Sequence, residues 1–153
     1  MTERESLTVR IANHEEMVAT ETAAYEQRQS DDAQAIDACN EAIRLLRGFP
    51  SASQSLIQVN QLKDVTLKIS TRAMKEGSAF LPLISALTNL VEMDSVSPSA
   101  CQEVITLLEN LRDAIAAAKA QDVVSHNVNI QMWTQSSADM ASQMESLNTN
   151  IED

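Results

Sequence analysis

The chain has 153 residues and a net charge of −11, from 22 acidic and 11 basic residues. This charge argues against a nucleic-acid partner, whose phosphates need a basic face. No apolar run is long enough to insert into a membrane. Glycine occurs twice and proline three times, too few for the turns of an all-β chain. We therefore predict one all-α domain over residues 1–153, with a core of aliphatic side chains because aromatic residues make up only 3%.

Three groups of helix-breaking residues divide the chain. They lie at residues 47–51, 77–78 and 94–99, where glycine, proline and serine gather. The predicted helices are about 4–47, 52–76, 79–94 and 99–151. The first and fourth exceed the usual length of a globular helix, which is typical of coiled coils. We predict an elongated four-helix arrangement, with two long coiled-coil-like outer helices, the first and the fourth, and two shorter helices between them.

The first helix carries a seam of core-phase residues at alternating steps of four and three, the spacing of a coiled coil. In order, these are Leu7, Ile11, His14, Val18, Glu21, Tyr25, Arg28, Asp32, Ile36, Cys39, Ile43 and Leu46. The step from Asp32 to Ile36 is an extra step of four, a stutter that locally unwinds a supercoil. The fourth helix has a similar seam with a stutter from Asp122 to His126. Because several seam positions are polar, we expect these stretches to rest against neighbours in an assembly or to be loosely packed.

A short internal repeat links the two long helices. Residues 38–46 align without gaps on residues 100–108, with six of nine positions identical. Both copies place a cysteine in the core phase, which favours duplication of a helical hairpin. An up-down bundle would bring Cys39 and Cys101 toward the same end of the molecule. There they could form a disulfide or remain two buried free thiols.

Carboxylates cluster along the first helix, with eight between Ile11 and Ile43 against one basic residue. Calcium prefers six to eight oxygens gathered by a tight loop, whereas a straight helix presents only one or two carboxylates to any point. We therefore predict no defined metal site and no tightly bound cofactor. Weak calcium contacts shared between molecules are the expectation, and their best candidates are Glu15, Glu16, Asp31 and Asp32.

Residues 56–75 have the opposite charge. Lys63, Lys68, Arg72 and Lys75 stand there against Asp64. Such runs are ordinarily solvated helix faces. Read functionally, an acidic first helix and a basic middle are complementary surfaces through which molecules could stack.

The sequence also resembles a known family. His14-Glu15-Glu16, followed by AQAIDACNEAIRLL at residues 33–46 and a Ser-rich turn at 51–53, is similar to the trichocyst matrix proteins of ciliates and the related granule lattice proteins. The resemblance covers residues 14–56. It implies an acidic secretory protein, cleaved from a larger precursor and packed into a crystalline granule core that expands on exocytosis when it meets calcium.

These observations favour a structural protein of a trichocyst- or mucocyst-like secretory granule. It would be secreted, would assemble with itself and related matrix proteins, and would change its packing with calcium or pH. The alternative is a soluble, cytoplasmic helical-bundle adaptor that binds a basic helical partner. No Ser/His/Asp, phosphate-loop or paired-acid arrangement occurs at a spacing that would bring its members together, so we predict no enzyme activity.

Overall fold

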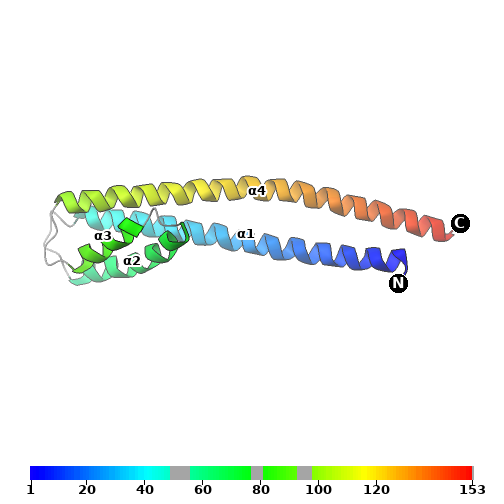
Figure 1. The fold of residues 1–153 in the computed structure, drawn as a ribbon, viewed down its shortest axis with the longest axis horizontal. Helices are drawn as coiled ribbons and strands as arrows, with labels where there is room; N and C mark the ends of the chain where they lie inside the picture. The colour runs from blue at the N-terminus through cyan, green and yellow to red at the C-terminus, as the bar shows by residue number, and fades with distance from the viewer. Residues whose placement is uncertain (49–55, 77–80, 93–97, 153) are drawn as a thin grey trace. The chain divides into compact units, whose positions relative to one another are not determined.

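The computed structural model describes residues 1–48, 56–76, 81–92 and 98–152, which form four α-helices and no strand (Figure 1). The helices are α1 (Glu3–Gly48), α2 (Leu56–Glu76), α3 (Leu81–Glu92) and α4 (Pro98–Glu152). The all-α class, with long first and fourth helices around two shorter ones, is thereby confirmed. The predicted helix starts at 52 and 79 and the predicted end at 94 lie outside the described residues. None of the described helices combines the length and the apolar character that a membrane span requires.

The chain divides into two compact units. Unit 1 consists of Met1–Gln29 and Ala120–Asp153, and unit 2 consists of Ser30–Lys119. Both long helices contribute to both units, whereas α2 and α3 belong to unit 2 alone. The single domain over residues 1–153 stays a prediction.

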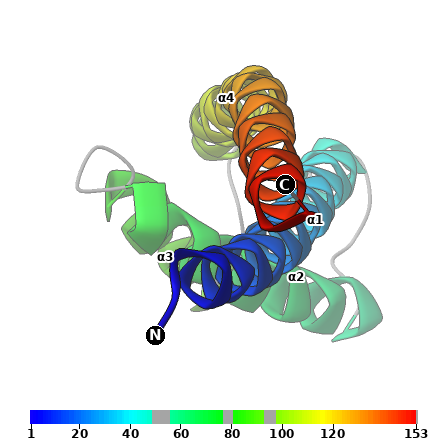
Figure 2. The ribbon, with the colours of Figure 1, turned by 90° about the vertical axis from the view of Figure 1, so that its right-hand side faces the viewer.

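Unit 2 holds the hydrophobic core, to which all four helices contribute. In both views α2 and α3 lie beside each other (Figures 1 and 2). The large side chains with under 2% exposure are Leu46, Leu62, Ile69, Leu83, Leu87, Leu108, Leu111 and Ile115. None of the described core residues is aromatic, as the composition predicts. Because burying each Leu or Ile stabilises by about 1.5–3 kcal/mol, most of the hydrophobic stabilisation lies in this unit.

The seam of α1 differs in detail from the predicted one. From Val18 the less exposed residues continue to Thr22 and then, by steps of three and four, to Gln29, while Glu21 and Arg28 are exposed. The stutter therefore lies at Val18–Thr22, earlier along the helix than predicted. The early stutter turns two charged side chains out of the seam, where burying them would be costly. Beyond Gln29 the predicted seam of unit 2 is correct.

One carboxylate remains in the seam. Asp32 is only 6% exposed, and Arg72 of α2 donates to its Oδ1 from Nη2 at 2.9 Å. The Arg72 side chain is itself only 20% exposed. The pair lets α2 pack against a polar position of α1, because each charge compensates the other away from water.

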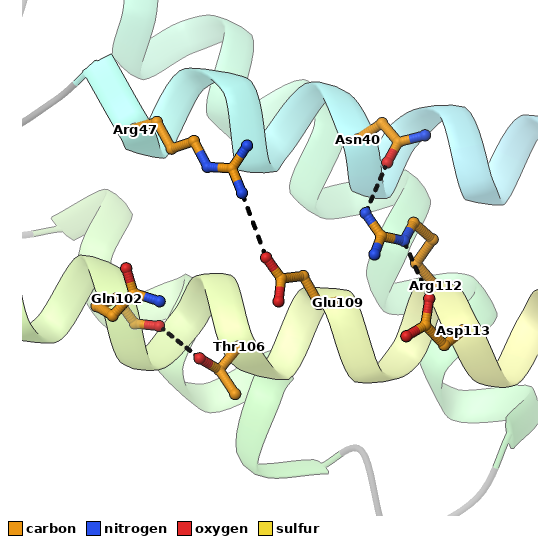
Figure 3. A network of polar contacts seen from close by, with 7 residues as sticks. All are labelled: Asn40, Arg47, Gln102, Thr106, Glu109, Arg112 and Asp113. Carbon is orange, nitrogen blue, oxygen red and sulfur yellow. Dashed lines mark hydrogen bonds and ion pairs between the residues drawn. The ribbon is translucent and has the colours of Figure 1, made fainter.

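Polar contacts also set the register of α1 against α4 in unit 2 (Figure 3). Arg47 Nη2 lies 3.3 Å from Glu109 Oε1, and Arg112 Nη1 donates to Asn40 Oδ1 at 3.2 Å. Because the lower number on α1 pairs with the higher one on α4, the helices are antiparallel. Arg47 and Glu109 directly follow the two repeat copies at equivalent positions, so the ends of the copies lie side by side.

Removing the Asp32 carboxylate should destabilise unit 2 strongly. We expect Asp32→Ala to lower the free energy of unfolding by about 3 kcal/mol, because Arg72 loses its buried counter-charge. Urea denaturation followed by circular dichroism measures this loss. Asp37→Ala, which removes an exposed carboxylate of the same helix, is the matched control and should change stability by less than about 0.5 kcal/mol. Equal losses in the two variants would contradict this account of the pair.

Candidate assembly interface

Unit 1 is an antiparallel pair made by the first part of α1 and the last part of α4. Among its described residues only Leu7, His126 and Met140 are buried. Two helices on their own can cover only one stripe of each other. Most of the surface of both helices in this unit therefore remains exposed.

A group of rings joins the two helices of unit 1. Tyr25 stacks on His126 with ring centroids 3.8 Å apart and planes within 4°, and Trp133 meets His126 edge-on at 5.7 Å. The Nε2 atom of His14 lies 3.2 Å from the carbonyl oxygen of Trp133. Both histidines thus occupy the seam as predicted, and the only Tyr and Trp of the chain lie beside them.

Two polar residues that the sequence predicts for the seams, Arg28 and Asp122, pair with each other. Arg28 donates to Asp122 twice, from Nε to Oδ2 at 3.0 Å and from Nη2 to Oδ1 at 3.1 Å. These hydrogen bonds, and the charge of the guanidinium, hold the pKa of Asp122 below its usual value. The two charges therefore compensate each other within the chain, where the sequence predicts contact with a neighbouring molecule or loose packing. In the sequence, only the opposite charges at predicted seam positions of the two helices indicate this ion pair, and they do not specify which residues meet.

An open groove runs beside the ring group, between α1 and α4 of unit 1. It has a volume of about 620 Å³, and apolar side chains form much of its lining. They are Val18, Ala19, Trp133, Ala138 and Ala141. Glu15 and His14 also line it. We call this the α1–α4 groove. Periodicity alone does not reveal it, because its alanines are too small to mark a face.

The comparison with known families gives a match over nearly the whole chain. The family described as Trichocyst matrix protein T1-F matches residues 3–153. The chain belongs to this family. The resemblance seen at residues 14–56 therefore extends through both units. No curated protein and no solved structure matches the chain.

Membership of a trichocyst matrix family indicates a structural role in the granule matrix and a location in a secretory granule. The same membership favours a protein without enzyme activity. In the described part of this matrix protein, no three potential ligands among His, Cys, Asp and Glu come together as a metal site would require.

The four calcium candidates of this trichocyst matrix protein are not brought together. Glu15 and Glu16 are exposed in unit 1, and Asp31 is exposed in unit 2. Asp32 is instead buried against Arg72, so it would have to give up an ion pair to bind a cation. Shared calcium contacts at these carboxylates stay a prediction, with Glu15, Glu16 and Asp31 as the exposed members.

Cys39 and Cys101 are both buried free thiols of the unit 2 core. Each lies eight residues before the Arg47–Glu109 contact, on helices that run in opposite directions. They therefore lie on opposite sides of that contact, roughly 24 Å apart along the helix axis at 1.5 Å per residue. A disulfide needs Cα atoms within about 7 Å, so of the two states that the sequence leaves open, this arrangement has the two buried free thiols. The antiparallel register is the reason, since it separates equivalent positions of the two copies.

Loss of the Arg28 guanidinium should change the response of unit 1 to acid. A carboxyl with a lowered pKa in the folded state contributes stability above its unfolded pKa, about 3.8, and loses it as the pH falls through the folded pKa. We expect Arg28→Gln to reduce stability at pH 7 by about 0.5–1 kcal/mol, because the pair is partly exposed. Its deficit relative to wild type should shrink below pH 4, which thermal unfolding by circular dichroism measures. Arg4→Gln is the exposed control and should track the wild type.

The buried thiols should make unit 2 sensitive to alkali. Burial raises the pKa of Cys39 from 9.0 to about 11, against a smaller lowering by Arg112, and burial also raises the pKa of Cys101. Because the pKa of the thiol is higher in the folded chain, the stability associated with the neutral, buried thiol is fully present below pH 9. It is lost as the pH rises toward 11. Urea midpoints across this range should fall less in Cys39→Ala/Cys101→Ala than in wild type. An identical fall would contradict the assignment, and mass spectrometry of the unreduced chain tests whether both thiols are free.

Proposed function

We propose that this protein is a lattice-forming component of a secretory-granule matrix, which assembles with itself and related matrix proteins. Its packing changes with calcium or pH, and this change accompanies exocytosis. Family membership supports the structural role. The observation that carries the proposal of assembly is the incomplete burial of unit 1.

Large apolar side chains of unit 1 face solvent. They include Val124, Val128, Ile130 and Met132 on α4, which are 43–60% exposed. Residues 123–138 of α4 contain no Asp, Glu, Lys or Arg, so this apolar surface carries no fixed charge of its own. Such a surface gains stabilisation when a neighbour covers it. A lattice supplies such neighbours.

The charge of unit 1 opposes its packing against the same unit of another molecule. Its residues include 11 acidic and 3 basic side chains, which gives −8 of the total of −11. Divalent cations would screen this repulsion, and protons would neutralise it. Exposed Glu15 and Glu16 are the side chains through which calcium would act, at low affinity and between molecules. The balance between apolar attraction and charge repulsion is the means by which calcium or pH would change the packing.

A soluble adaptor for a basic helix is the alternative function, because unit 1 offers the same acidic surface to a foreign partner. The two functions differ in what the chain does alone. A matrix component assembles without any other protein, whereas an adaptor does not.

Light scattering of the full chain tests the proposal. We expect scattering to change by several-fold when about 1 mM calcium is added, in the range of weak calcium sites, and again when the pH is lowered to about 5, where carboxylates begin to protonate. Sodium chloride at equal ionic strength is the control for simple screening. Glu15→Gln/Glu16→Gln should respond less to calcium than the control variant Asp37→Asn/Glu103→Gln, whose two exposed carboxylates lie in unit 2. A wild-type chain that stays monomeric and is indifferent to calcium and pH would rule out the matrix function.

A further inference from the structure

The outer face of α2 combines apolar and basic side chains. Leu67 is 71% exposed and Met74 is 65% exposed, on a helix whose opposite face lies in the core of unit 2. Lys63, Lys68 and Lys75 are exposed as well. At 100° per residue, Leu67 and Met74 lie along the middle of this face, with Lys63 on one side and the other two lysines on the other. We call this the α2 stripe.

Arg72, the only arginine of α2, is not part of the α2 stripe. Arg72 contacts Asp32 in unit 2, so among the α2 side chains that the structure describes, residues 60–75, the outward charge comes from the three lysines together with Asp64. A basic stripe with exposed Leu and Met at its centre is an unusual feature in so acidic a protein. Its chemistry calls for a partner that is both apolar and acidic.

The α1–α4 groove of unit 1 has this complementary chemistry. Its lining is largely apolar, with Trp133 and several alanines, and Glu15 stands at its edge. Around it, α1 carries four exposed glutamates, Glu15, Glu16, Glu21 and Glu26, with no Lys or Arg from 11 to 27. The α4 segment from residue 120 onward contains no Lys or Arg.

We infer that the α1–α4 groove of one molecule receives the α2 stripe of a second copy. Leu67 and Met74 enter the groove, while the lysines face the glutamates of α1. The two apolar side chains are seven residues apart, or about 10.5 Å along α2. The groove residues Trp133 and Ala141 are eight residues apart, or about 12 Å along α4, so the groove is long enough for both side chains. This inference rests on the proposed function and names the contact through which it operates.

The second copy is the occupant because the chain carries both halves of the contact. Unit 1 has a charge of −8, so a like surface of another molecule would be repelled, whereas the lysines of the α2 stripe are attracted. Groove and stripe are different surfaces, which makes the contact heterologous. A heterologous contact that does not close into a ring continues from molecule to molecule, and this is how a lattice row grows.

Charge reversal on the stripe tests the contact. We expect Lys68→Glu/Lys75→Glu to raise the protein concentration at which scattering begins by roughly tenfold, because two attractive exposed pairs become repulsive. Arg4→Glu/Arg10→Glu adds the same negative charge away from α2 and away from the lining of the α1–α4 groove. This control should shift the onset much less. An equal shift in both variants would overturn the inference and would assign the effect to net charge.

A charge reversal on the groove side should restore the assembly that the reversal on the α2 stripe weakens. Glu15→Lys/Glu16→Lys alone should assemble poorly, and an equimolar mixture with Lys68→Glu/Lys75→Glu should assemble at nearly the wild-type concentration. Restoration requires that the two sites meet between molecules. Mixtures that scatter no more than either variant alone would contradict the pairing. Circular dichroism of each variant checks folding, and Leu67→Ser/Met74→Ser tests the apolar half at two exposed positions if a charge variant does not fold.

Trp133 reports on the groove directly, because it is the only tryptophan of the chain. Its fluorescence emission should shift to shorter wavelength as the wild type assembles, and this shift should be absent from Lys68→Glu/Lys75→Glu at the same concentration. Wild-type assembly with unchanged Trp133 emission would overturn the groove contact and leave the matrix function standing. A wild type that never assembles would contradict the matrix function and this contact together.

Discussion

A helix that pairs with only one other helix can bury only one stripe of its surface, and this limit separates the two units of the protein. In unit 2, α2 and α3 join the long helices, so Leu and Ile side chains from four helices close a core. In unit 1, α1 and α4 have only each other, and three described residues are buried. The exposed apolar side chains and the α1–α4 groove follow from this difference. The unit that is least complete by itself is therefore the one that offers surfaces for assembly.

The ion pairs between the helices fix the register in which the helices pack. Arg28 with Asp122, and Asp32 with Arg72, satisfy one another inside the chain, so they fix register rather than wait for a neighbour. A buried pair of charges adds little net stability compared with apolar packing, but losing one partner is costly. Such pairs therefore disfavour alternative registers of two helices whose apolar seams alone are weak. The proposed assembly would then depend on the exposed charges and apolar side chains, which the ion pairs leave unchanged.

In the proposed assembly, the distribution of charge favours contacts between unlike surfaces. Unit 1 carries most of the negative charge, whereas the lysines of α2 lie on the outer face of unit 2. Similar surfaces repel and dissimilar ones attract, so contacts between copies are expected to join different surfaces. Because exposed ion pairs are individually weak and sensitive to salt, a packing built from many of them can rearrange when the ionic conditions change. This is the physical basis of the proposed change of packing with calcium or pH.

The sequence by itself determined the helices, the aliphatic core and the family. Glycine, proline and serine mark the three breaks, the apolar spacing marks the seams, and the motifs of residues 14–56 carry the resemblance that the family match confirms. These signals are local, so they can be read along the chain. The tertiary structure decided what depends on register. It placed the stutter at Val18–Thr22 and put Cys39 and Cys101 on opposite sides of the Arg47–Glu109 contact. It also turned Arg72 inward while three lysines of the same helix face outward. These outcomes depend on which residue of one helix meets which residue of another, and spacing along a single helix does not contain that information.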